Sequence, residues 1–152
     1  MQIKSEQQDG KTNLTQDLVI HFPDGIPAFE DAQNFSLAGN EDMEPFVMLL
    51  SLDVEDLGFF CINPFQLDEN YSFKLNSEVQ KALKLTDPND VLVLSFVTRA
   101  EKPQDFTANL LAPIVINVKN HLAKQVILEK YPVRLNIWDA IEKIEARQDG
   151  EA

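Results

Sequence analysis

The sequence contains little of what enzymes and exported proteins commonly use. Its 152 residues include one cysteine, two histidines and five glycines. A single cysteine cannot form an internal disulfide, and the glycines are too scattered for a P-loop or a dinucleotide-binding fingerprint. His21 and His121 share no recognisable zinc-ligand spacing with Cys61, which lies in an apolar run and is predicted to be a buried, inert thiol. These absences argue against catalysis, a cofactor and a metal site.

Long apolar runs and an excess of basic residues are also missing. No apolar run approaches the 18 residues of a membrane span, and the first residues lack the basic-then-apolar pattern of a signal peptide. Thirteen basic residues face 25 acidic ones, giving a formal net charge of −12 and a pI near 4.4. Because Lys and Arg normally contact phosphates, nucleic acid and anionic membranes are disfavoured as partners. We expect a cytoplasmic protein whose electrostatic complement is a basic protein.

Most of the chain consists of short apolar or alternating runs of strand length. The predicted strands cover residues 18–22, 46–52, 57–62, 91–97, 106–118 and 126–128. Pro113 cannot donate to a strand ladder, so it predicts an edge or a break within its segment. Residues 29–44 are rich in Asn, Gly, Asp and Glu and are predicted to form a surface connection, while residues 119–124 are predicted to form a polar turn.

Two short segments have helical character. Ser77 and Gln80 form a capping box, with Ser77 as the predicted N-cap, and a helical apolar stripe runs through Trp138, Ile141 and Ile144. Many short strands with one or two short helices predict a mainly β fold, a compact antiparallel β-barrel-like single domain.

The predicted domain organisation has three parts. Residues 1–13 are polar and are expected to form a flexible N-terminus. Residues 14–135 form the β domain. Residues 136–152 form a C-terminal amphipathic extension, whose end beyond Arg147 is expected to be disordered.

Three acidic clusters in predicted turns are the candidate partner-binding residues. They are Glu41, Asp42 and Glu44; Asp53, Glu55 and Asp56; and Asp68 and Glu69. The middle cluster begins like a calcium loop, but Leu57 and Pro64 occupy positions five and twelve, where oxygen ligands belong. Solubility accounts for any single cluster. Their placement near strand ends predicts that they meet at one end of the barrel and form a docking surface for a basic partner.

Several segments resemble motifs of the bacterial flagellar assembly factor family. Residues 22–30 (FPDGIPAFE) resemble its N-terminal motif, and residues 106–117 (FTANLLAPIVIN) resemble its most distinctive motif. Shorter similar segments follow in the expected order, so the resemblance covers residues 16–135. Ala28 and Ala123 stand where the family usually has glycine, which predicts slightly different turns at these two places.

The resemblance implies a β-barrel-like fold, no catalysis, no cofactor and two protein partners. These are flagellin, bound before export, and the carbon storage regulator, a small RNA-binding translational repressor. The implied mechanism is partner switching: accumulated flagellin occupies the assembly factor and frees the regulator to repress flagellin translation. Export of flagellin then releases the assembly factor, which antagonises the regulator. The residues alone leave open a generic acidic interaction module or a small ligand-binding β-barrel.

Overall fold

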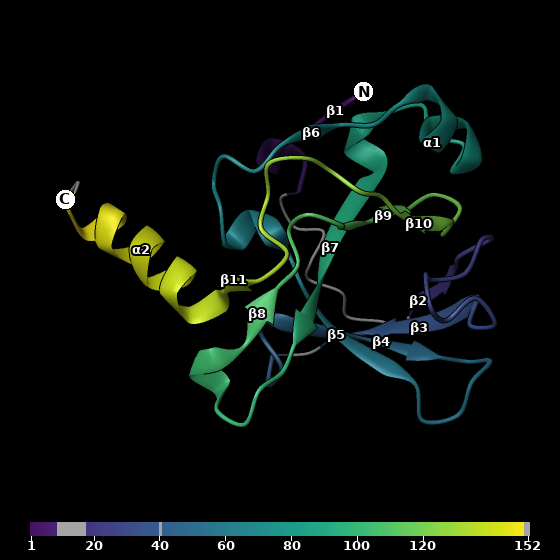
Figure 1. Cartoon of the computed structure of the whole chain (residues 1–152). Coiled ribbons are helices and arrows are strands. Elements are labelled where there is room, and N and C mark those ends of the chain that lie inside the picture. Colours follow the sequence, from purple (N-terminus) through teal and green to yellow (C-terminus); the bar gives the residue numbers. More distant parts are fainter. Residues whose placement is uncertain (9–17, 40, 151–152) are drawn as a thin grey trace.

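The computed structural model describes residues 1–8, 18–39 and 41–150. These residues form eleven short strands and two α-helices (Figure 1). The strands are β1 (Gln2–Ile3), β2 (Leu18–His21), β3 (Asn34–Ala38), β4 (Phe46–Ser51), β5 (Gly58–Ile62), β6 (Phe73–Lys74), β7 (Val91–Thr98), β8 (Thr107–Ala108), β9 (Ile114–Asn117), β10 (Ala123–Gln125) and β11 (Leu135–Asn136). The helices are α1 (Ser77–Ala82) and α2 (Ile137–Gly150), and four 3-10 turns are η1 (Ser5–Gln8), η2 (Pro64–Gln66), η3 (Pro88–Asp90) and η4 (Pro103–Asp105). The predicted mainly β fold is confirmed.

One antiparallel sheet dominates the molecule, with strand order β10-β9-β7-β5-β4-β3-β2. The eight-residue strand β7 is its centre: residues 91–94 pair with β9, whereas Ser95 and Phe96 pair with β5. Strand β8 pairs with the end of β7 and with β11. Figure 1 shows β7 running between the β2–β5 part of the sheet and the β9–β10 part.

Within the described residues, the two edges of this sheet meet at one end only. His21 of β2 forms an isolated parallel bridge with Leu122, and the His21 amide donates to the His121 carbonyl at 2.9 Å. Next to this bridge, Lys124 pairs with Asp24 at 2.9 Å. The sheet is therefore barrel-like without closing along its length.

Two hydrophobic cores lie on opposite faces of the sheet. Alternate residues of a strand point to opposite faces, so Leu92 and Leu94 of β7 enter the core inside the curled sheet, while Val91 and Val93 enter the core outside it. Strand β9 is divided in the same way and is buried at all four positions. This explains why these strands read as nearly continuous apolar runs.

Three local predictions are wrong. Residues 34–38, assigned to a surface connection, form strand β3, with Phe35 and Leu37 fully buried. The predicted strand at 126–128 is displaced: β10 occupies Ala123–Gln125, inside the predicted polar turn. The N-cap of α1 is Asn76, whose side chain accepts from the Val79 amide at 2.9 Å. Asn and Ser are equally good caps, so two adjacent cap residues made the boundary ambiguous.

The N-terminus belongs to the domain, contrary to the predicted flexible segment 1–13. Strand β1 pairs with β6, so that Ile3 lies opposite Phe73, and Ile3 is fully buried. The Leu75 amide donates to the Met1 carbonyl at 2.8 Å. Residues 9–13 lie outside the described part of the chain.

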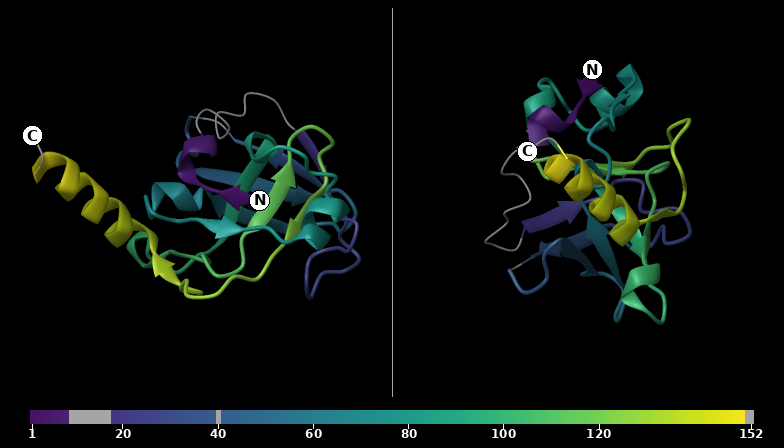
Figure 2. Two further views of the ribbon diagram at one scale, coloured as in Figure 1. Left: turned by 90° about the horizontal axis from the view of Figure 1, so that it is seen from above. Right: turned by 90° about the vertical axis from the view of Figure 1, so that its left-hand side faces the viewer.

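Helix α2 is anchored at its beginning. Ile137 and Ala140 are buried, and the Trp138 ring contacts the Phe46 ring edge-on at 6.2 Å between centroids. The rest of the helix projects from the body (Figure 2). The helix includes residues 148–150, for which disorder was expected, and residues 151–152 lie outside the described part.

Candidate protein-binding face

The three predicted acidic clusters do not meet at one end of the sheet. Residues 41–44 precede β4 and residues 53–56 follow it, so the six-residue strand separates them by roughly 20 Å. Residues 68–69 follow η2, after the end of β5 that pairs with Phe46, and so leave the sheet on the side of residues 41–44. In an antiparallel sheet, the connections before and after a strand lie at opposite ends of that strand. The prediction of a single acidic end did not take this into account.

Asp53 has a structural role within its turn. Its Oδ2 accepts hydrogen bonds from the backbone amides of Gln33 at 2.9 Å and Asn34 at 2.7 Å. The Asn34 side-chain nitrogen also donates to Asp53, and the Asn34 oxygen lies 2.8 Å from Nδ1 of His21. Asp53 thereby fastens the β4–β5 turn to the beginning of β3.

These hydrogen bonds lower the pKa of Asp53, the bonds from the Asn34 and Gln33 amides contributing most. A lowered folded-state pKa means that the carboxylate stabilises the fold above the unfolded-state pKa. This contribution is lost as the pH falls through the folded-state pKa. The three charges at 53–56 are therefore not equivalent, and Asp53 is unsuitable for a neutralisation intended to leave the fold unchanged.

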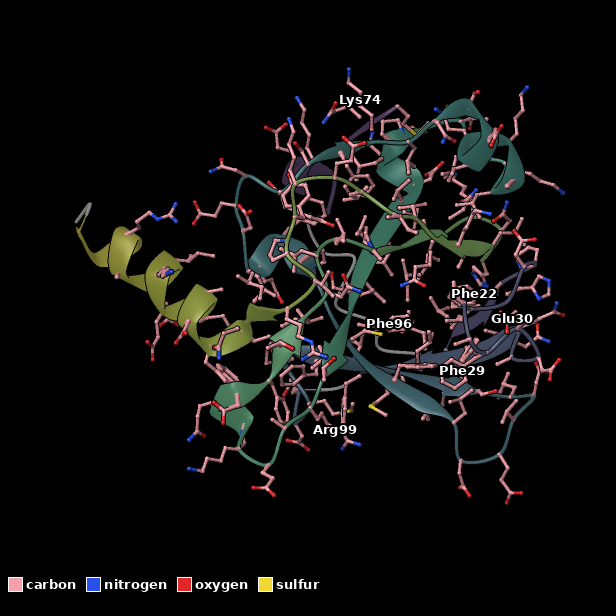
Figure 3. The ribbon with its side chains drawn as sticks, viewed as in Figure 1. Phe22, Phe29, Glu30, Lys74, Phe96 and Arg99 are labelled. Carbon is pink, nitrogen blue, oxygen red and sulfur yellow. The ribbon has the colours of Figure 1, made fainter. Side chains whose placement is uncertain are left out.

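The fold brings further carboxylates to the 53–56 turn. Since Phe35 pairs with Ser51, the β2–β3 connection lies at the same end of the sheet as the β4–β5 turn. We call this region the acidic end; its exposed carboxylates are Asp24, Glu30, Asp31, Asp53, Glu55 and Asp56. Figure 3 shows Phe29 and Glu30 at this end, away from α2. Asp24, Glu30 and Asp31 were not among the predicted partner-binding residues, although they flank or belong to the 22–30 motif.

The charge of the chain is strongly segregated. Residues 12–73 contain twelve acidic and no Lys or Arg residues, whereas the remaining 90 residues contain thirteen of each. The described part of 12–73 includes strands β2 to β5. Nine of these twelve acidic residues lie between the start of β2 and the end of β5, so the fold concentrates negative charge on the β2–β5 half of the sheet.

The outer face of this acidic half is apolar. Residues directly paired across antiparallel strands share a face, and two rows on this face are Val19–Ser36–Leu50–Gly58 and Ala38–Met48–Phe60. We call its large apolar residues the sheet strip: Val19, Met48, Leu50, Leu52 and Phe60. Strands β2 to β5 contain no Asp, Glu, Lys or Arg.

The sheet strip is accessible to solvent. Val19 is 54% exposed, Leu50 43% and Leu52 57%. Leu52 continues the face beyond β4, because its amide donates to the Asn34 carbonyl at 2.8 Å. Among the described residues, the outer core covers this face only at the start of β4, where Phe46 packs. The strip from Met48 onward therefore has the character of a contact surface.

Aromatic residues connect the sheet strip to the base of α2. Phe60 contacts Phe46 with 6.2 Å between ring centroids, and Phe46 contacts Trp138. The Arg99 guanidinium lies 4.5 Å from the Phe60 ring centroid, a cation–π contact. Arg99 is labelled in Figure 3, where it follows the end of β7. Acidic turns thus lie beyond both ends of the strip in the strand direction, and Arg99 and α2 lie along one of its sides.

The Cys61 thiol and the Tyr71 hydroxyl are buried inside the protein. Burial raises the pKa of the Cys61 thiol, which is fully buried. The Tyr71 hydroxyl donates to the Leu110 carbonyl at 2.7 Å, and burial likewise raises the pKa of Tyr71.

Within residues 1–8, 18–39 and 41–150, no three His, Cys, Asp or Glu side chains are grouped to hold a metal ion. No helix in this part of the chain is long and apolar enough to cross a membrane.

The 22–30 motif builds the turn next to the acidic end. Gly25 has φ +70°, and a Cβ there would lie 2.6 Å from the Glu30 carbonyl oxygen, so glycine is required. Ala28 also has a positive φ of 74°. Alanine at position 28 thus adopts the left-handed conformation that glycine favours. Ala123 is a buried strand residue of β10 and does not have a positive φ.

Replacing Ala28 by glycine is expected to stabilise the protein by about 0.5–1 kcal/mol, because left-handed backbone costs alanine about 1–2 kcal/mol and glycine loses more chain entropy on folding. Chemical denaturation measures the change. The matched control is Ala100→Gly, an exposed site without a positive φ, which should be neutral or destabilising. Equal effects at both positions would contradict the strain at Ala28.

Comparison with known proteins gives consistent matches. A family model described as "FliW protein" matches residues 3–137, ending where α2 begins. The flagellar assembly factor FliW of Bacillus subtilis (strain 168) is 39% identical over 119 residues, covering 78% of this chain and 83% of the relative. That of Caldicellulosiruptor bescii is 35% identical over 140 residues, covering 91% of each. A crystal structure of the flagellar assembly factor FliW superposes with a TM-score of 0.73 at 37% identity, covering 78% of this chain and 84% of that chain.

Proposed function

The chain belongs to the FliW family of flagellar assembly factors, and on this basis we propose that it binds flagellin in the cytoplasm and antagonises the carbon storage regulator. The family is one of assembly factors rather than enzymes, in agreement with the sequence prediction. Partner switching then connects the two activities: bound flagellin frees the regulator, and exported flagellin leaves the assembly factor available to bind it.

The charge distribution supports the regulator as a partner. A protein that represses translation by binding RNA needs a basic surface for phosphates. The β2–β5 half of this chain carries nine acidic residues and no Lys or Arg, six of the acidic residues at the acidic end and three in residues 41–44. Complementary charge increases the rate of encounter and orients the partner. This segregation of charge is the observation that supports the proposal most directly.

A binding experiment with three proteins tests the function. Purified chain is titrated calorimetrically with flagellin and with the regulator from the same organism, first separately and then in competition. We expect micromolar or tighter binding of each, release of the regulator when flagellin is added, and restored RNA binding by the released regulator. If the chain binds neither protein at micromolar concentration, the proposed function is overturned, although the chain still belongs to the family.

Neutralising Glu55 and Asp56 together should slow association with the regulator roughly 2–10-fold at low salt and flatten its salt dependence, because rim charges act mainly on association. Both side chains are exposed, and Asn tolerates the positive φ of 63° at Asp56. The variant is Glu55→Gln with Asp56→Asn, leaving Asp53 intact. Stopped-flow mixing across a salt series measures the rates.

The matched control removes two charges from the electrically balanced part of the chain, Glu101→Gln with Glu142→Gln, both at exposed positions. It should have a much smaller effect on the association rate. Identical rates for the Glu55/Asp56 variant and the unmodified protein at every salt concentration would place the regulator away from this turn.

A further inference from the structure

We propose that the sheet strip is a docking site for an amphipathic α-helix that carries basic residues near both ends. Resting on the proposed function, the inference assigns this helix to flagellin. It specifies both the surface of this chain that makes the contact and the chemistry that the bound segment must have.

The dimensions of the strip suit one helix. Four adjacent strands about 4.8 Å apart give a width of roughly 14 Å, and a helix with its side chains is about 10–12 Å across. Val19, Leu50 and Leu52 are each about half exposed, while Met48 and Phe60 are partly exposed between the strands. Covering these side chains with the apolar stripe of a helix removes them from water, which is favourable.

The charges around the strip define the ends of the helix. Residues 41–44 lie beyond the start of β4, and the acidic end lies beyond its last residue. These two groups are roughly 20 Å apart, and at a rise of 1.5 Å per residue a helix covers that distance in about 13 residues. The bound segment is therefore expected to have an apolar stripe with Lys or Arg residues separated by about 13 positions.

The same charges argue against other occupants. In a two-fold contact between two copies of this chain, acidic turns of one copy would face acidic turns of the other, because both ends of the strip are acidic. Nucleic acid and anionic lipid surfaces are repelled for the same reason. A partner that is apolar at its centre and basic at its ends satisfies both features of the face.

The test uses substitutions that preserve charge. Leu50→Gln with Leu52→Gln makes the strip polar, and the control Ile127→Gln with Val133→Gln changes two exposed apolar residues elsewhere, which are 82% and 52% exposed. Calorimetry with full-length flagellin measures affinity. We expect about tenfold weaker binding for each leucine replaced, since covering a leucine contributes about a factor of ten or more, and no change for the control.

The outcomes separate this inference from the function on which it rests. If the unmodified protein binds no flagellin, both are overturned. If it binds, but the strip variant and the control bind equally well, only the docking site is overturned. Thermal unfolding of each variant verifies the fold, and the single variant Leu52→Gln, at a position outside the β4 ladder, gives the same test if the double variant is unstable.

Discussion

Replacing Phe35 by alanine is expected to destabilise the protein by about 3–5 kcal/mol, the range for removing a large buried aromatic side chain. Phe35 is fully buried in β3, inside the curled sheet. Its ring makes an edge contact with Phe22 at 5.3 Å and a tilted contact with Phe59 at 6.2 Å. The substitution leaves a cavity that these neighbours cannot easily fill. Domains of this kind are stable by only about 5–15 kcal/mol, so much of the stability is lost.

Chemical denaturation with an unchanged m-value measures this loss. The matched control is Phe29→Ala, because Phe29 also contacts the Phe59 ring, at 5.5 Å, but is 42% exposed. Its loss should be about 1 kcal/mol, the scale of an aromatic pair contact. Equal losses at the two positions would mean that Phe35 is not a central core residue and that β3 is incorrectly placed.

Replacing Ile3 by alanine is expected to cost about 2–5 kcal/mol, although the residue lies almost at the chain end. Ile3 is fully buried in the outer core, and its strand pairs with β6. The substitution removes apolar contacts and weakens the pairing that holds the first residues against the domain. A flexible terminus would show no such dependence.

The control is Ile127→Ala, the same substitution at a residue that is 82% exposed, which should change stability by less than about 0.5 kcal/mol. Hydrogen exchange at the Leu75 amide, which donates to the Met1 carbonyl, provides a second measurement. Protection there should decrease in Ile3→Ala and remain in the control. If the two variants are equally stable, the N-terminus does not contribute to the core.

The sequence was sufficient to predict the strands that consist of apolar runs. Strands β4, β5 and β7 were predicted from apolar runs of strand length at residues 46–52, 57–62 and 91–97. Strand β3 was missed because only Phe35 and Leu37 point inward, while Asn, Ser and Ala occupy the alternate positions. Ile3 was missed because one apolar residue among polar neighbours has no periodicity. Its burial depends on pairing with Phe73, seventy residues away.

The candidate site was predictable only in part. The acidic turns were evident, but their grouping depends on which strand ends are adjacent, and antiparallel topology separates residues 41–44 from residues 53–56. The structural role of Asp53 depends on backbone amides twenty residues earlier in the chain. The sheet strip could not be recognised because the same apolar run supplies inward and outward residues, and sequence does not show which face remains uncovered.

A molecule whose negative charge is concentrated in one half has a large permanent dipole. With the residues outside 12–73 balanced at thirteen charges of each sign, the electric field turns the β2–β5 half toward a basic partner before contact. Rotation into the productive orientation then precedes collision, and the balanced half, including α2, is held away from the encounter. Adding salt, which shortens the screening length to about 8 Å at physiological strength, removes this orientation before it affects the apolar contact.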